Sequence, residues 1–160
     1  MEKHPAVVWS LRLLAALAIG AFFIEMYAVK FKLGVVVDID VLSLNKIALG
    51  EGEAMKQLAK LSNDRSKMYP ALYLYLLPFV AGIVFSFIGK LKPYAKYVYA
   101  VGFLVSLVII FTLFAALVGR IDNVGVLPNG WYHVAYFVAL AGFVLSMASI
   151  LRYAMEKLRE

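Results

Sequence analysis

The chain has 160 residues, of which 64% are hydrophobic and 16% are charged, and its formal net charge is +6. A soluble domain averages about half apolar and about a quarter charged residues, so this composition excludes a water-soluble enzyme domain. The absence of cysteine excludes disulfides, thiolate zinc sites and iron–sulfur clusters. A chain of this length corresponds to one domain, residues 1–160.

Four apolar segments of membrane length follow one another along the chain: Val7–Val29, Ala71–Ile88, Tyr94–Val118 and Trp131–Leu151. Because a bilayer core of about 30 Å needs roughly 20 helical residues, each segment is predicted to be a transmembrane helix. Strands are a poorer interpretation, since the segments lack the alternation of polar and apolar residues that a membrane barrel requires. The sequence therefore predicts an all-α membrane protein built as a four-helix transmembrane bundle.

A long loop, Lys30–Pro70, connects the first two predicted helices. Its first half, residues 33–49, is rich in β-branched residues and predicts two short strands with a turn near Ser43–Lys46. In its second half, Glu53–Leu61 has the apolar spacing of a short amphipathic helix. We therefore expect a small extracytoplasmic cap of strands and one helix between the first and second transmembrane helices.

The distribution of basic residues indicates which side of the membrane the cap faces. An even number of spans places both termini on one side, and the Lys and Arg residues divide equally between the two sides. Positive residues in short connections weigh more than those in a long loop, and Lys90, Lys92 and Lys96 lie in one tight turn. Both termini are therefore expected in the cytoplasm of a cell-membrane protein.

Glu25 is an ionisable residue inside the first predicted helix, and such a residue is by default a functional candidate. It lies about four residues, or roughly 6 Å, from the end of that segment. It could therefore reach the headgroups or pair with Lys30, Arg120 or His133, which are predicted at the same level. We take Glu25, Arg120 and His133 as a candidate polar cluster with a structural role, and a proton or ion relay is the alternative.

The fourth predicted helix carries a stripe of small residues at steps of four and three. The stripe consists of Ala135, Ala139, Gly142, Ser146 and Ser149. Small residues let helices approach closely in lipid. We expect this stripe to pack inside the bundle, and an interface between molecules is the alternative.

Motifs for catalysis and cofactor binding are absent from the sequence. His4 lies in a tail and His133 at a membrane edge, so they do not form a facing pair for haem. Asp38 and Asp40 could share a strand face, but a calcium loop of EF-hand type needs an oxygen ligand at the position of Leu42. We therefore predict no catalytic residue, metal or cofactor. The positive charge is spread over both membrane sides, which fits lipid headgroups better than nucleic acid.

The order of the predicted elements resembles that of the claudin-like four-helix membrane proteins. A first helix precedes a loop of strands and a short helix, and three more helices follow with a tight turn between the second and third. The loop of claudins carries a tryptophan within a G-L-W-C-C signature; here the loop has neither Trp nor Cys, and Arg65 is the one loosely corresponding residue. The resemblance covers nearly the whole chain as topology. It implies an outer sheet that meets partners through its loops, without the family's barrier or channel role.

These features predict a non-enzymatic membrane protein that contacts lipids and assembles, as an accessory or structural protein, with other membrane subunits or with copies of itself. The alternative is a small transporter, or a lipid- or quinone-binding protein, that uses Glu25, Arg120 and His133 in a cavity. A closed bundle favours the first function and a deep polar cavity at Glu25 the second.

The amide and cysteine content of the sequence is typical of a protein from a thermophilic source. The sequence contains one Gln and four Asn, and depletion of such labile residues is a tendency of hyperthermophile proteins. A midpoint of thermal unfolding below about 60 °C in detergent would contradict this prediction.

Overall fold

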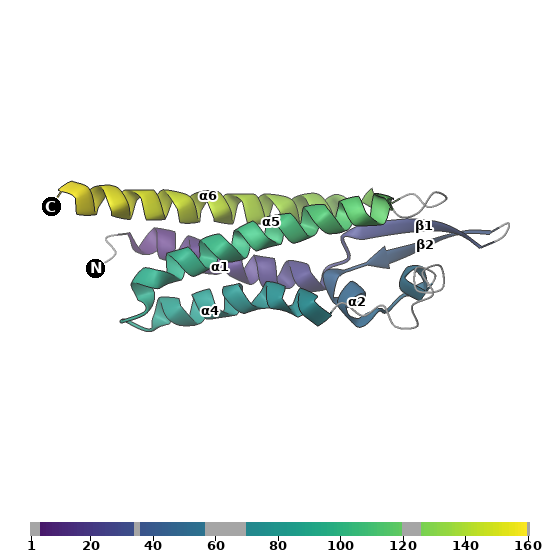
Figure 1. The fold of residues 1–160 in the computed structure, drawn as a ribbon, viewed down its shortest axis with the longest axis horizontal. Coiled ribbons are helices and arrows are strands. Elements are labelled where there is room, and N and C mark those ends of the chain that lie inside the picture. Colours follow the sequence, from purple (N-terminus) through teal and green to yellow (C-terminus); the bar gives the residue numbers. More distant parts are fainter. Residues whose placement is uncertain (1–3, 34–35, 57–69, 120–125, 160) are drawn as a thin grey trace.

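The structure is a computed structural model that describes residues 4–33, 36–56, 70–119 and 126–159. Four long helices run side by side, and a small sheet and short helices lie at one end of them (Figure 1). Both termini lie at the opposite end, as an even number of antiparallel helices requires. The sheet and the short helices at that end are called the cap below.

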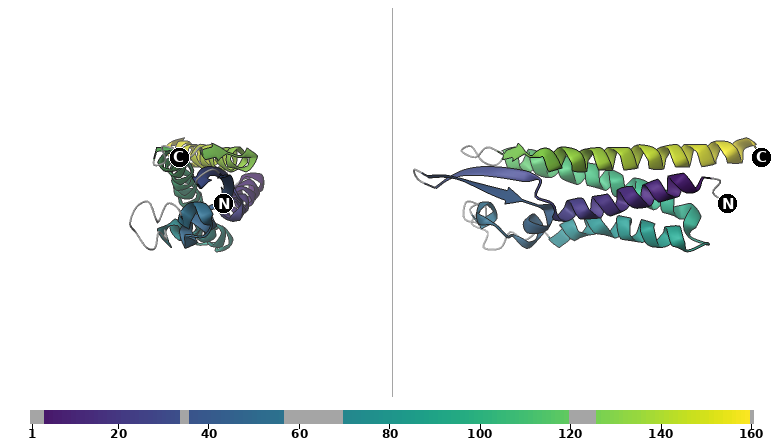
Figure 2. Two further views of the ribbon diagram at one scale, coloured as in Figure 1. Left: turned by 90° about the vertical axis from the view of Figure 1, so that its right-hand side faces the viewer. Right: turned by 180° about the vertical axis from the view of Figure 1, so that it is seen from behind.

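The four long helices form the predicted bundle. They are α1 (Pro5–Phe23), α4 (Leu76–Phe87) preceded by the 3₁₀ helix η1 (Pro70–Tyr75), α5 (Ala95–Gly119) and α6 (Gly130–Arg159). Each is long and apolar enough, with its preceding 3₁₀ turn where it has one, to cross a membrane. Contacts join α1 to α4, α4 to α5, α5 to α6 and α6 back to α1, and the view along the bundle shows this closed ring (Figure 2).

The first helix ends earlier than predicted. It stops at Phe23, Ile24 is extended, and strand β1 (Tyr27–Leu33) begins three residues later. The prediction that helix continues to Val29 is therefore wrong. Tyr27 and Val29 are buried whereas Lys30 is exposed, which is the two-residue period of a strand. Over so short an apolar run, hydropathy cannot separate a strand from the end of a helix.

The two predicted strands exist, but they lie earlier in the chain. Strand β1 pairs antiparallel with β2 (Val36–Leu42). The turn predicted near Ser43–Lys46 is wrong, because helix α2 (Leu44–Leu49) begins there. Ser43 caps this helix, since its Oγ accepts a hydrogen bond of 3.1 Å from the Lys46 backbone N–H. Gly50, with a φ of 68°, ends it.

Two further segments complete the cap. Residues 53–56 are helical, as predicted for the start of the amphipathic helix, and the rest of that prediction, to Leu61, lies outside the described residues. Strand β3 (Val126–Pro128) was not predicted from the sequence, and it pairs with β1 so that the strand order is β2-β1-β3. The connection between α5 and α6 thus contributes to the same sheet as the first loop.

Glycines set the close approach of the helices. A Cβ added at Gly82 of α4 would lie 2.6 Å from the Tyr99 ring of α5, and one at Gly142 of α6 would overlap the Phe103 ring. Such contacts do not occur between real atoms, so both aromatic rings occupy space that only glycine leaves open. The stripe residues Ala135, Ala139, Gly142 and Ser146 are buried, and Ser149 is partly exposed.

Hydrogen bonds between side chains and helix carbonyls cross the bundle core. The Tyr75 hydroxyl donates to the Ala18 carbonyl of α1 at 3.1 Å and accepts from Ser106 Oγ of α5 at 3.0 Å. The Tyr27 hydroxyl reaches from the sheet into the bundle and donates to the Ile110 carbonyl at 3.1 Å. Each of these buried hydroxyls is satisfied, which is what an apolar interior requires.

Candidate functional site

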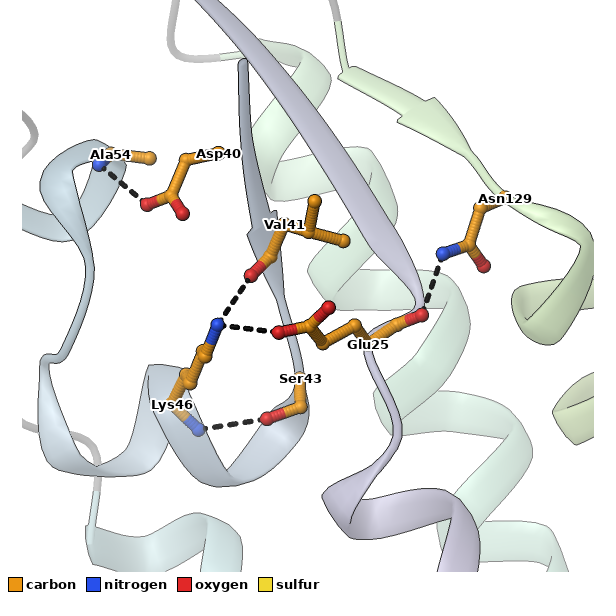
Figure 3. A network of polar contacts seen from close by, with 7 residues as sticks. All are labelled: Glu25, Asp40, Val41, Ser43, Lys46, Ala54 and Asn129. Carbon is orange, nitrogen blue, oxygen red and sulfur yellow. Dashed lines mark hydrogen bonds and ion pairs between the residues drawn. The ribbon is translucent and has the colours of Figure 1, made fainter.

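The candidate residue Glu25 lies at the junction between the bundle and the cap (Figure 3). It is two residues beyond the end of α1, and 49% of its side chain is exposed. Its carboxylate Oε1 lies 2.6 Å from Lys46 Nζ of α2. The structure therefore places Glu25 outside the helical span that the sequence predicted for it, at the surface of the molecule.

Lys46 holds its position through two further contacts. Its Nζ also donates to the Val41 carbonyl of β2 at 3.0 Å, and its backbone N–H donates to the capping Ser43. The hydrogen bond to the Glu25 carboxylate raises the pKa of Lys46 above its ordinary value. Lys46 of α2 thus binds both Glu25, at the end of α1, and the backbone of β2.

The backbone of Glu25 is tied to the start of α6 through Asn129. Asn129 Nδ2 donates to the Glu25 carbonyl at 2.6 Å, and its Oδ1 accepts from the backbone N–H groups of Trp131 at 3.0 Å and Tyr132 at 3.2 Å. The second pair of bonds is an N-cap for α6. One amide therefore connects the end of the first helix to the beginning of the last, although the two are about a hundred residues apart in the sequence.

The predicted polar cluster is only partly described by the structure. His133 lies exposed in the first turns of α6, with its ring 5.6 Å from that of Tyr132, and Lys30 is exposed in β1. Arg120 lies outside the described residues. The partner that the structure gives Glu25 is Lys46, which sequence reasoning did not consider because it assigned that segment to a turn.

Asp40, considered as half of a metal pair, has a structural contact instead. Its Oδ2 accepts a hydrogen bond of 3.0 Å from the Ala54 backbone N–H, which links β2 to the helical residues 53–56. Gly52 has a φ of 102° and passes so close that a Cβ there would lie 2.5 Å from the same oxygen. Among the described residues, no three His, Cys, Asp or Glu side chains are grouped as a metal would need.

A second polar arrangement lies near the other end of the bundle. Arg12 of α1 donates from Nε to Ser86 Oγ at 2.8 Å and from Nη2 to the Ser86 carbonyl at 2.7 Å. Its guanidinium lies over the rings of Phe87, at 3.8 Å, and Trp9, at 4.7 Å. An arginine in an apolar helix is thus hydrogen-bonded on one side and covered by aromatic rings, both of which lower the cost of its charge.

Comparisons of the chain with known protein families, with curated proteins and with solved structures gave no match. The contacts at the junction tie α1, the cap and α6 to one another, and they leave the side chain of Glu25 half exposed and paired with a cation.

Proposed function

We propose that the protein is a non-enzymatic, multi-pass membrane protein whose four long helices span the bilayer and whose cap meets other membrane subunits or copies of the same chain. The observation that carries this proposal is the filled interior of the bundle. Phe103 occupies the space beside Gly142, and the small-residue stripe of α6 is buried. A bundle filled in this way supports a scaffold rather than a path for a solute.

The surroundings of Glu25 also favour a scaffold. A relay residue needs a carboxylate that exchanges protons within the span. The Glu25 carboxylate lies beyond the last residue of α1 and is hydrogen-bonded to a lysine at the surface. This pairing supports a structural role and speaks against the alternative of a small transporter.

The proposed orientation puts both termini in the cytoplasm and the cap outside the cell. It can be tested with single cysteines at Glu51 in the cap and at Lys90 in the turn after α4, because the chain has no cysteine of its own. Both positions are exposed. A membrane-impermeant maleimide added to intact cells is expected to label Glu51→Cys and to spare Lys90→Cys, and the reverse pattern would invert the orientation.

Assembly through the cap is tested by photo-crosslinking in native membranes. A crosslinking residue at Glu51 is expected to give discrete protein adducts, whether copies of this chain or other subunits. The matched control is Phe137, an exposed apolar position on α6 that would face lipid. Protein adducts from Phe137 but not from Glu51 would contradict a role for the cap.

The transporter alternative is tested on the purified protein in sealed vesicles. We expect no proton- or ion-coupled flux from the parent chain or from Glu25→Gln. A flux that the parent supports and Glu25→Gln abolishes would overturn the scaffold proposal.

A further inference from the structure

The turn between α4 and α5 concentrates positive charge in a long stretch without acidic residues. From residue 70 to residue 119 the sequence contains no Asp or Glu, and its basic residues are Lys90, Lys92 and Lys96. The turn lies at the end of the bundle that carries both termini (Figure 1). In the neighbouring α6, Glu156 is already paired with Arg152 at 3.2 Å. Among the described residues at this end, basic side chains outnumber acidic ones.

A small, partly open cavity lies beside this turn, and we call it the basic cavity. Lys92, Lys96, Ser86, Ala95 and Tyr99 line it together with two apolar residues of α1. Its volume of about 10 Å³ admits one water-sized group. Ala95 is the first residue of the 25-residue helix α5, so the cavity also receives the partial positive charge of a helix N-terminus.

One polar group in the basic cavity makes no hydrogen bond of standard geometry. The Tyr99 hydroxyl is buried, and no described group bonds it with that geometry. The neighbouring Ser86 Oγ lies close to it, but that oxygen already donates to the Ile83 carbonyl and accepts from Arg12 Nε. The whole of Tyr99 is 1% exposed. Gly82 lies against the Tyr99 ring and leaves room for it in this position. A buried hydroxyl without a partner is costly, so a fixed donor here indicates that something else accepts its hydrogen bond.

The two lysines of the cavity are placed differently. Lys96 is buried, and its Nζ lies 3.5 Å above the ring of Tyr153 in α6. Lys92 is partly exposed at the turn. The surface around them is aromatic, because Trp9, Tyr94 and Tyr97 are all exposed. Exposed Trp and Tyr prefer the headgroup layer of a bilayer, which is the level at which a lipid phosphate lies.

We propose that the basic cavity binds the phosphate of an anionic phospholipid. One phosphate oxygen occupies the cavity and accepts the hydrogen bond of the Tyr99 hydroxyl, and the partly exposed Lys92 neutralises the charge. The rest of the headgroup stays outside, because the cavity admits a single oxygen-sized group, and the acyl chains follow the apolar faces of α1 and α4. The proposal requires membrane insertion but does not depend on the partners of the cap.

The decisive variant is Tyr99→Phe, which removes the hydroxyl and leaves the ring and the net charge unchanged. In delipidated protein in uncharged detergent it is expected to be at least as stable as the parent, because it removes an unpaired polar atom. Phosphatidylglycerol is expected to raise the unfolding midpoint of the parent by about 5 °C when it is in large excess over its Kd. In Tyr99→Phe its affinity should fall by about tenfold.

The lysines are tested by a pair of variants with equal charge change. Lys92→Gln alters a residue that lines the cavity, whereas Lys90→Gln alters an exposed residue of the same turn that does not. At about 0.15 M salt, where charges that make no direct contact are partly screened, Lys92→Gln should weaken phosphatidylglycerol binding by about fivefold. Lys90→Gln should change it by less than about twofold.

Two ligand controls separate the sources of a phosphate. Phosphatidylcholine should raise the midpoint of the parent by less than half as much as phosphatidylglycerol, because its headgroup carries no net charge. An equal effect of inorganic phosphate would show that the cavity takes a soluble anion, which overturns the lipid proposal. Equal losses in Lys90→Gln and Lys92→Gln, with none in Tyr99→Phe, would assign the binding to diffuse surface charge and would also overturn it.

Discussion

The bundle and the cap of this protein are held together by different means. In the bundle the decisive contacts are fits of rings into the space beside glycines, such as Phe103 against Gly142. In the cap, polar contacts accompany a buried apolar core that includes Leu42 and Ile47: Ser43 caps α2, Asp40 accepts from the Ala54 N–H, and Lys46 bridges to Glu25. At the junction between them, the Asn129 amide bonds the Glu25 carbonyl and caps α6, and the Tyr27 hydroxyl bonds the Ile110 carbonyl.

The difference follows from the two solvents that we propose for them. Lipid tails are as apolar as leucine, so helices in a bilayer gain little from hydrophobic burial and depend on close packing. In the proposed arrangement the cap lies in water, where side chains can satisfy the unpaired backbone groups at helix ends and strand ends with a small gain in stability. Changes of shape should therefore damage the bundle more than changes of charge damage the cap.

The largest effect is expected for Gly142→Ala. The added methyl group would overlap the Phe103 ring, so the α5–α6 contact must open, at a cost of about 3 kcal/mol in the free energy of unfolding. Gly20→Ala is the matched control, because nothing lies within 4 Å of a Cβ there. The control should be neutral or up to about 1 kcal/mol more stable. Denaturation in detergent, followed by circular dichroism, compares the two, and equal midpoints would contradict the packing argument.

At the junction, Asn129→Ala should cost about 2 kcal/mol. The change removes the N-cap of α6 and also the bond to the Glu25 carbonyl. Asn129→Asp is the informative partner, because a carboxylate keeps the cap but cannot donate to that carbonyl. It should recover about half of the loss. Full recovery would mean that the hydrogen bond from Asn129 to the Glu25 carbonyl contributes nothing.

Alkaline pH should destabilise the junction. Burial raises the pKa of the Tyr27 hydroxyl, and the bond to Glu25 raises that of Lys46. Above about pH 10 the unfolded chain loses these protons first, so the folded state binds more protons and stability falls as the pH rises. The buried Tyr27 contributes up to about 1.4 kcal/mol per pH unit there, and the partly exposed Lys46 contributes much less, because water screens its pair with Glu25. Tyr27→Phe should reduce the difference in bound protons between the folded and unfolded states by about one, so the free energy of unfolding should fall less steeply with pH. An unchanged slope would contradict the raised pKa of Tyr27.

The smallest effect is expected for the Glu25–Lys46 pair. Because both side chains are partly exposed, water screens the pair, and a double-mutant cycle of Glu25→Gln with Lys46→Met should give a coupling of about 0.5 kcal/mol. The exposed pair Arg152–Glu156 within α6 serves as a reference. A coupling of several kcal/mol at Glu25 would indicate a buried ion pair and reopen the question of a role in transport.

Hydropathy predicted the four helices but not all of their ends. It extended the first helix to Val29, because Tyr27, Ala28 and Val29 are apolar whether they form a helix or a strand. It ended the last helix at Leu151, although α6 continues to Arg159. In both cases the apolar run indicates which residues are suited to contact with lipid. The helix itself can end before the last of these residues, as α1 does, or continue beyond it, as α6 does.

The polar contacts were harder to predict than the helices. Lys46 could be recognised as a partner of Glu25 only after α2 was known to begin at Leu44. Asn129 was close to the predicted start of the last helix, and an Asn there is a recognisable N-cap, but its second bond, to Glu25, depends on tertiary structure. The stripe of α6 could be predicted as a pattern because its period is set by one helix alone.

The length of α6 has a practical consequence. Its 30 residues extend roughly 45 Å, which exceeds a bilayer core of about 30 Å, and residues 151–159 are exposed throughout. A rigid module joined in helical register at the end of this helix would project at a fixed distance and turn by about 100° for each residue inserted. A rigid fusion to this helix could therefore make a 17.8 kDa protein large enough for its orientation to be determined in electron micrographs.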